Sequence, residues 1–329
     1  MMEIGNLTYV TEFTLAGLTS CRKIQIVLFM VFLIVYLFTI LGNLVIILLV
    51  WTESSLHTPM YFFLIQLSGL EICYVTCTLP QMLVHLHSGT GAISFTRCAT
   101  QMYFALSLGG TECLLLAAMA FDRYLAICQP LLYSTTMGKW RQLQLSLVCW
   151  SGGFILGSIN VGSTLWFPFC GPNHVDHFFC ELPAVLKLSC ADTHIAEAAV
   201  FLASVLLLLF PVSIILTSYG LILCSVLQMR SISGRHKAFS TCASHLIVVT
   251  IFYGTVMSTY MIPRLESGPD HDKHISVFYM LITPLINPII YTLRNKDVHG
   301  AVVKVMPPLF FCKKDSARSE HPITLTDWS

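Results

Sequence analysis

Seven long apolar stretches, separated by short polar segments, constrain the fold of this chain more than any other feature. An α-helix needs about 20 largely apolar residues to cross the hydrocarbon core of a bilayer, because each residue advances it by about 1.5 Å. The stretches that meet this demand are residues 24–50, 60–83, 98–121, 143–165, 198–227, 238–262 and 275–293. The sequence therefore predicts an all-α bundle of seven transmembrane helices.

The overall composition agrees with a membrane-embedded chain. Hydrophobic residues make up 55% of the 329 residues and charged residues only 11%, whereas about 25% of the residues of a soluble domain are charged. The net charge of +1 gives no basis for a nucleic acid partner, which would require a strongly basic surface.

The distribution of basic residues predicts the orientation. Lys and Arg are enriched on the cytoplasmic side of membrane proteins, and here twelve of eighteen fall on the side opposite the N-terminus. We expect a multi-pass plasma membrane protein with an extracellular segment 1–23, a transmembrane domain 24–293, and a cytoplasmic segment 294–329. That last segment should contain a short interfacial helix and a tail. The sequon Asn6-Leu7-Thr8 would place glycosylation at Asn6, on the extracellular side.

An acidic and a basic residue stand together where the third stretch ends, in the triplet Asp122-Arg123-Tyr124. Adjacent opposite charges at a helix end hold each other neutral at the lipid boundary. The arginine remains available to release its partner and bind another group on the aqueous side. Such an arrangement is typical of a switch rather than of a catalyst.

Five sequence runs, in order, carry a specific resemblance. They are residues 119–133 around the Asp122 triplet, 59–64 (PMYFFL), 218–219 (SY), 237–245 (KAFSTCASH) and 284–296 (PLINPIIYTLRNK). Together they resemble olfactory receptors, a branch of the rhodopsin-like G-protein-coupled receptors. The resemblance implies a receptor for a volatile odorant, a stimulatory G protein that raises cyclic AMP as partner, and expression in olfactory sensory neurons.

The resemblance also implies which residues form the switch that couples to the G protein. Asn287-Pro288 would act as a hinge, because proline frees a carbonyl inside a membrane helix; a passive kink is the alternative. Tyr219 and Tyr291 would meet near Arg123 in the active receptor. The full set is Asp122, Arg123, Tyr124, Tyr219, His245, Asn287, Pro288 and Tyr291.

Four cysteines lie in segments predicted to be extracellular: Cys98, Cys170, Cys180 and Cys190. Four cysteines allow three pairings, between which the sequence alone does not decide. The resemblance implies the bridges Cys98–Cys180 and Cys170–Cys190.

The same loop also carries a weaker pattern. His174, His177, Cys180 and Glu181 could form a site for a soft metal ion. An oxidised Cys180 would remove the thiolate from that set, and we favour this second interpretation.

Two carboxylates, Glu71 and Glu112, lie inside predicted spans. Ionisable residues at membrane depth are costly and are candidates for function. Two carboxylates facing one cavity either share protons or hold a cation. The resemblance assigns these positions to a Na⁺ site, although Glu71 stands where the family commonly has Asp. A protonated pair bonded to Ser68 and Asn287 is the alternative.

A ligand site is expected among inward-facing residues of the spans near the extracellular side. The set is Met102, Ala105, Leu106, Gly109, Gly110, Ser204, Leu207, Tyr253, Val256, Met257, Tyr260 and Met280. It contains no acid that could pair with an amine, so a small, mostly apolar and neutral molecule fits best. Within the run Phe252-Tyr253-Gly254, Tyr253 is the expected link between ligand and helix movement.

Other classes of protein fit the sequence less well. A non-olfactory rhodopsin-like receptor for a small lipophilic ligand is the nearest rival, and the run 237–245 argues against it. A transporter would usually show internal repeats and more intramembrane charges. No metal-binding or nucleophile–base motif lies in any span, so we expect neither an enzyme nor a cofactor other than the Na⁺ ion.

Overall fold

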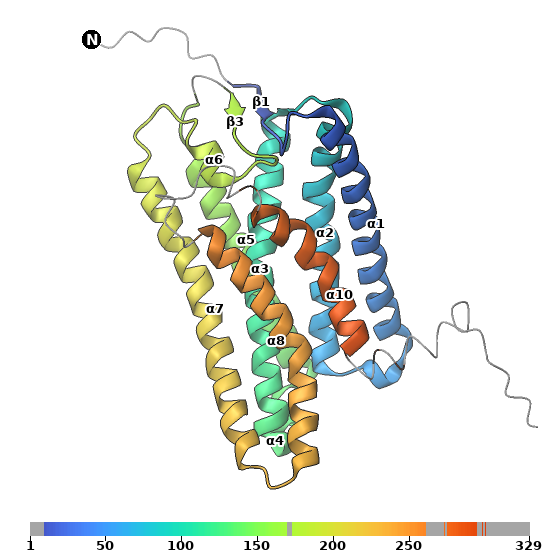
Figure 1. The fold of residues 1–329 in the computed structure, drawn as a ribbon. Helices are drawn as coiled ribbons and strands as arrows, with labels where there is room; N and C mark the ends of the chain where they lie inside the picture. Colours follow the sequence, from blue (N-terminus) through green and yellow to red (C-terminus); the bar gives the residue numbers. More distant parts are fainter. Residues whose placement is uncertain are drawn as a thin grey trace, which may run out of the picture.

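The computed structural model describes residues 10–169, 173–260, 273, 275–294, 298 and 300. Six long helices cross the bundle in alternating directions, and a shorter seventh segment completes it (Figure 1). The long helices are α1 (Arg22–Thr52), α2 (Pro59–Ser88), α3 (Phe95–Cys128), α5 (Lys139–Leu165), α7 (His194–Gln228) and α8 (Ile232–Tyr260). The seventh segment is a π-helical turn η2 (Phe278–Ile282) followed by α10 (Thr283–Arg294).

The seven predicted spans match these elements, and the fold class predicted from sequence is confirmed. Five of the helices are long and apolar enough to cross a membrane by themselves: α1, α2, α3, α5 and α7. The helices run several residues past the apolar stretches, because local signals rather than hydrophobicity end them. Pro59 begins α2, where its missing N–H costs nothing, and Gly89 follows it in the left-handed conformation with a φ of 79°.

One end of the bundle, which we call the sheet end, carries a small three-stranded sheet (Figure 1). Strand β1 (Glu12–Leu15) pairs antiparallel with β2 (Ala92–Ser94) and parallel with β3 (His174–Val175). Phe13 of β1 is 1% exposed and packs against Phe95 and Phe169, with ring centroids 5.9 Å away from each. The N-terminal strand therefore closes this end together with two connecting loops.

The opposite end, which we call the Arg123 end, contains the short helix α4 (Pro130–Thr136) and the close of α3 (Figure 1). Exposed tryptophans mark both boundaries of the apolar belt: Trp51 and Trp140 lie toward the Arg123 end, and Trp166 lies toward the sheet end. Tryptophan favours the membrane–water interface, where one part of the indole is apolar and the other is hydrated. The three residues thus agree with a spanning bundle.

Helix α3 lies closely against α5, and two glycines of α5 make that approach possible. A Cβ added to Gly153 would lie 2.6 Å from the Ser107 carbonyl oxygen, and one added to Gly157 would lie 2.0 Å from the Ser107 hydroxyl. The spacing of four residues puts both glycines on one helix face, as in other tightly packed membrane helices. Any larger residue at either position would push α5 away from α3.

The remaining elements are short. They are η1 (Ser54–Leu56) between α1 and α2, and α6 (Leu182–Leu186) in the loop between α5 and α7. The interfacial helix predicted within 294–329 lies almost entirely outside the described residues, as does Asn6.

Candidate functional site

A small internal cavity lies between α2, α3, α7, α8 and η2. Its volume is about 100 Å³. Most of its lining is apolar, and the lining residues are Tyr74, Ala105, Leu106, Gly109, Gly110, Glu112, Cys113, Ser204, Leu207, Leu208, Phe252, Val256 and Tyr279. A small, largely apolar space of this kind would admit only a small ligand held mostly by apolar contacts.

Seven of the twelve residues proposed for ligand binding line this cavity: Ala105, Leu106, Gly109, Gly110, Ser204, Leu207 and Val256. The two glycines differ in their surroundings. A Cβ on Gly109 would meet no atom within 4 Å, whereas one on Gly110 would lie 3.3 Å from Leu207. Gly109 therefore borders open space, and Gly110 permits close packing of the helices.

Of the other five proposed residues, four lie elsewhere: Met102, Met257, Met280 and Tyr253. Met102 is buried in a separate cluster near the sheet end, with Cys98 and Cys180, because the loop after α5 covers that part of α3. Met257 packs against the main core, and Met280 is 1% exposed within it. The side chain of Tyr260 lies outside the described residues.

Tyr253, the last of these four, joins helices rather than lining the cavity. Its ring is 4% exposed, and its hydroxyl donates a hydrogen bond of 3.0 Å to the Cys113 carbonyl oxygen. Because Cys113 and the neighbouring Phe252 both line the cavity, Tyr253 lies one residue behind its wall. It connects α8 to α3 directly beside the space that a ligand would fill.

Glu112 extends the cavity toward a buried polar group. This carboxylate lines the cavity and interacts electrostatically with Glu71, which is 1% exposed. Glu71 Oε1 accepts a hydrogen bond from Asn287 Nδ2. The other Glu71 oxygen and Glu112 Oε1 are buried and accept no hydrogen bond from any described residue, so they can hold a proton or a small hard cation.

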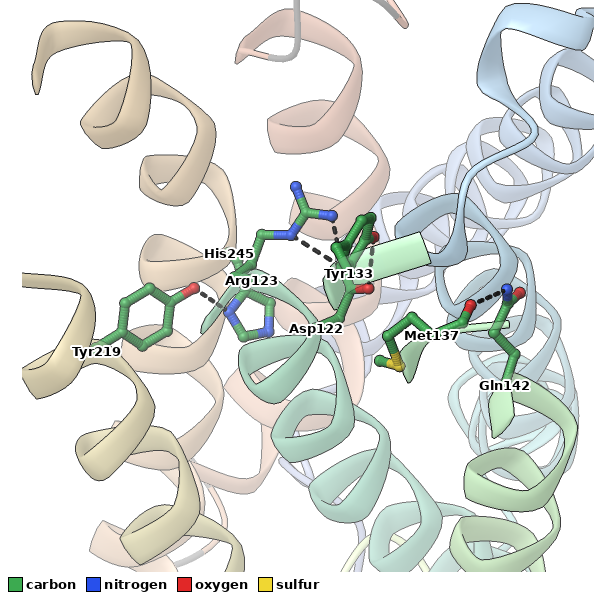
Figure 2. Close-up of polar contacts among 7 residues, drawn as sticks. All are labelled: Asp122, Arg123, Tyr133, Met137, Gln142, Tyr219 and His245. Atoms are coloured by element: carbon green, nitrogen blue, oxygen red, sulfur yellow. Dashed lines mark hydrogen bonds and ion pairs between the residues drawn. The ribbon is translucent and has the colours of Figure 1, made fainter. Parts of the chain in front are cut away.

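The triplet at the end of α3 forms a closed polar cluster (Figure 2). Arg123 Nη2 lies 2.5 Å from Asp122 Oδ2, and Arg123 Nε lies 3.1 Å from the same oxygen. The hydroxyl of Tyr133 in α4 donates to Asp122 Oδ1 at 2.8 Å. Since the Asp122 side chain is completely buried and that of Arg123 is 12% exposed, the two charges need each other here.

A second polar contact joins α7 to α8 beside this cluster (Figure 2). The Tyr219 hydroxyl and His245 Nδ1 are 2.6 Å apart, and the two rings are stacked. Tyr291 of α10 is 1% exposed. In this structure Arg123 is therefore bonded to Asp122, while Tyr219 is bonded to His245.

The sheet end is fixed covalently. The structure contains the bridge Cys98–Cys180, with a Cα–Cα distance of 5.4 Å. Cys190 also takes part in a disulfide, whereas Cys170, its expected partner, lies outside the described residues. The oxidised Cys180 offers no thiolate to the metal site considered for this loop, and His177 Nε2 instead lies 3.7 Å from Glu181 Oε2.

An ion pair adds to this end. Lys273, just ahead of the seventh segment, donates to Asp176 Oδ1 at 2.5 Å. The hydrogen bond from the Lys273 ammonium holds the pKa of the Asp176 carboxyl below its ordinary value.

Sequence reasoning missed several residues of these sites. Tyr74 and Tyr279 enter the cavity from α2 and η2, and Tyr133 bonds Asp122 from α4. Of these residues, only Tyr133 could have been found from the sequence, because it is the last residue of the run 119–133 that contains the triplet.

The architecture matches that of a solved membrane protein. Squid rhodopsin shares the fold with a TM-score of 0.72 at 16% sequence identity, over 92% of this chain and 88% of the rhodopsin chain. The bundle therefore has the fold of rhodopsin.

Sequence comparison places the chain more narrowly. Residues 32–308 match the olfactory receptor family. Human olfactory receptor 2D2 is 49% identical over 91% of this chain and 97% of its own length, and human olfactory receptor 2T8 is 47% identical over 93% and 97%. Mouse olfactory receptor 2B6 is 47% identical over 95% of this chain and 100% of its own length. The chain belongs to the olfactory receptor family.

Proposed function

We propose that this receptor binds a small, mostly apolar and neutral odorant in the cavity between α3, α7 and α8. The single observation that carries this proposal is the largely apolar cavity that borders Gly109 and lies beside Tyr253. Ser204 already donates its hydroxyl to the Val200 carbonyl oxygen at 2.8 Å, so toward a ligand it serves as an acceptor. A protonated Glu112 would offer a donor at the opposite side of the cavity.

The ligand would act by shifting a balance between two arrangements of the helices. It can do so only through a difference in its affinity for the two. A molecule wedged against Phe252 and Val256 presses on α8 where the Tyr253 hydrogen bond ties it to α3. Movement of α8 would separate His245 from Tyr219 and free Tyr219 to approach Arg123, with Tyr291 joining them.

Release of Arg123 would then open the Arg123 end to a stimulatory G protein that raises cyclic AMP. In this proposal the sheet end is extracellular, with a glycan on Asn6 and a second loop bridge Cys170–Cys190, and the Arg123 end is cytoplasmic. The excess of basic residues on that side supports the orientation. Olfactory sensory neurons are the expected site of expression.

Glu71 and Glu112 would connect the ligand cavity to the hinge at Asn287-Pro288. Glu112 faces the ligand, while Glu71 accepts a hydrogen bond from Asn287. A single shared proton, or Na⁺ held by the two carboxylates, would keep this buried pair from repelling. A change at Glu112 thus alters the balance of charge beside the hinge.

The test is an odorant panel on transfected cells with a cyclic-AMP reporter, followed by filling of the cavity. We expect responses to neutral alcohols, aldehydes, ketones or esters, and we expect Gly109→Leu to remove them at equal surface display, because its side chain would occupy the ligand space. Gly162→Leu is the matched control, since a Cβ there also meets no atom within 4 Å but the residue lies away from the cavity. A response confined to amines, or one unchanged in Gly109→Leu, would contradict the proposal.

A further inference from the structure

A second and larger hollow lies on the outside of the bundle, between α2, α3 and α5. This groove has a volume of about 710 Å³ and shares no lining residue with the ligand cavity. Phe104, Trp150 and Phe154 form one wall of it, as an aromatic ladder with centroids 6.1 to 6.4 Å apart. Cys73 and Thr76 line it and are exposed, so the groove opens toward the surrounding bilayer.

The length of the groove along α3 matches the thickness of one leaflet of a membrane. It extends along α3 from Arg97, two residues after the helix begins, to Leu108. Eleven residues of α-helix cover about 16 Å, roughly half of the hydrocarbon thickness. A lipid chain lying along Phe104 and Phe154 would therefore have its headgroup beside Arg97.

Three polar features gather at the Arg97 end of the groove. The Arg97 side chain is exposed and forms no hydrogen bond or ion pair with any described residue. Gln81 is 6% exposed; its Nε2 donates to the Ala92 carbonyl oxygen, while its buried Oε1 receives no hydrogen bond within the described part of the chain. Pro80 lacks the N–H that would otherwise bond the Thr76 carbonyl.

These features call for a ligand with one anion and two hydrogen-bond donors above an apolar chain. Arg97 suits a phosphate, while Gln81 Oε1 and the freed Thr76 carbonyl each require a donor. A phosphatidylcholine supplies the phosphate but has only ester acceptors below it. A sterol supplies one donor and no anion. A phosphosphingolipid carries a phosphate, an amide N–H and a hydroxyl together at the headgroup boundary.

We propose that the groove between α2, α3 and α5 is a binding site for a phosphosphingolipid of the sphingomyelin type. The phosphate lies at Arg97, the amide and hydroxyl donate to Gln81 and the Thr76 carbonyl, and the chain packs along the aromatic ladder. This inference takes the extracellular position of the sheet end from the proposed function, because such lipids populate the outer leaflet. It is otherwise independent of the odorant and the G protein.

The experiment uses the full-length receptor in nanodiscs that contain a sphingomyelin analogue with a photoreactive diazirine in its acyl chain. After irradiation, we expect labelled peptides from the groove segments 72–81, 93–108 and 150–154. Unlabelled sphingomyelin should reduce labelling on the order of two- to tenfold more effectively than phosphatidylcholine or cholesterol, the range expected for one or two additional hydrogen bonds.

Variants at the polar end separate the lipid site from general membrane contact. Arg97→Ala and Gln81→Met should each reduce labelling on the order of two- to tenfold, and Arg97→Lys should restore part of it because the positive charge returns. Lys23→Ala is the matched control. It removes an exposed positive charge at the sheet end, from α1 rather than from the groove, and should leave the labelling unchanged. Each variant is compared at equal recovery of monodisperse receptor.

Three outcomes would overturn the proposal. Equal competition by phosphatidylcholine would show that the donors do not matter. Competition by cholesterol alone would assign the groove to a sterol. Labels spread over α1 and α7, with no excess in the groove segments, would show only the annular lipid that surrounds every membrane protein.

Discussion

The two ends of this receptor are held together by different kinds of interaction. At the sheet end, a disulfide, a three-stranded sheet and an ion pair connect the N-terminal strand, α3, the loop after α5 and the segment before η2. At the Arg123 end, described contacts between α3, α4, α7 and α8 include hydrogen bonds among side chains and the Asp122–Arg123 pair. Covalent links limit helix movement, whereas hydrogen bonds of about 1 kcal/mol each exchange readily.

This contrast indicates where the molecule can move. In the proposed mechanism, a ligand that enters near the fixed end cannot easily spread the helices there, so we expect the displacement to reach the end held by exchangeable bonds. Tyr253 lies between the two, behind the cavity wall, and bonds α8 to α3. The comparison therefore predicts that substitutions at the sheet end lower stability, most of all where they remove the disulfide, whereas substitutions at the Arg123 end alter signalling.

The largest effect should follow from Cys98→Ser. Loss of the Cys98–Cys180 bridge, which spans 82 residues of sequence, is expected to cost about 2–5 kcal/mol and to abolish surface display. Surface staining of an N-terminal epitope measures this. Cys21→Ser is the control, because Cys21 is an exposed free thiol at the same end. Normal display of Cys98→Ser would show that the sheet and ion pair suffice without the bridge.

Arg123→Ala should leave display largely intact and remove the odorant-evoked cyclic-AMP response by at least an order of magnitude. In the proposed mechanism, the arginine must leave Asp122 before the Arg123 end can bind a G protein. The measurement is a dose–response curve at matched surface level, with Arg141→Ala as a control for loss of an exposed charge at the same end. A retained response would remove Arg123 from the switch.

Tyr133→Phe should weaken the closed cluster without breaking the Asp122–Arg123 pair. It deletes the 2.8 Å hydrogen bond to Asp122 Oδ1, and loss of one such bond should raise basal cyclic AMP on the order of two- to tenfold. Gln142→Ala is the control, because it removes a neighbouring hydrogen bond to the Met137 carbonyl that does not involve Asp122 (Figure 2). Unchanged basal activity would mean that Tyr133 contributes only to packing.

The sequence predicted the spans and the buried acids, because the bilayer itself imposes those patterns. Twenty apolar residues must lie in lipid wherever the rest of the chain goes, and a carboxylate such as Glu71 or Glu112 must lie inside the bundle. The family resemblance added the Cys98–Cys180 bridge, which the cysteines alone left among three pairings.

Features that depend on contacts between distant segments were not predictable in this way. β1 pairs with residues about 80 and 160 positions away, and no local pattern records those partners. Gly153 and Gly157 matter only because Ser107 lies against them. Met102 has a helical phase compatible with the cavity, yet the loop with Cys180 covers it. For Met102, position along the membrane normal rather than helical phase therefore kept the residue out of the cavity.

The smallest effect should come from the ion pair between Lys273 and Asp176 at the sheet end. Its pH dependence shows whether Lys273 or a nearby histidine controls the contact. Lys273→Gln removes the partner of Asp176, whose side chain is 55% exposed, so the expected loss is at most about 1 kcal/mol. In a protein of this size that corresponds to a fall in the thermal midpoint of about 1–4 °C. Lys187→Gln, in the same loop and exposed, is the control.

Because the pKa of Asp176 is lowered in the folded state, its contribution is present above the ordinary carboxyl value of 3.8 and is lost only as pH falls through the lowered one. The difference between wild type and Lys273→Gln should therefore stay constant from pH 7.5 to about pH 5. His174 and His177 face the same carboxyl and also lower its pKa, so their protonation favours the ionised Asp176. A difference that disappeared between pH 7 and pH 6 would instead show that a histidine, not Lys273, controls this contact.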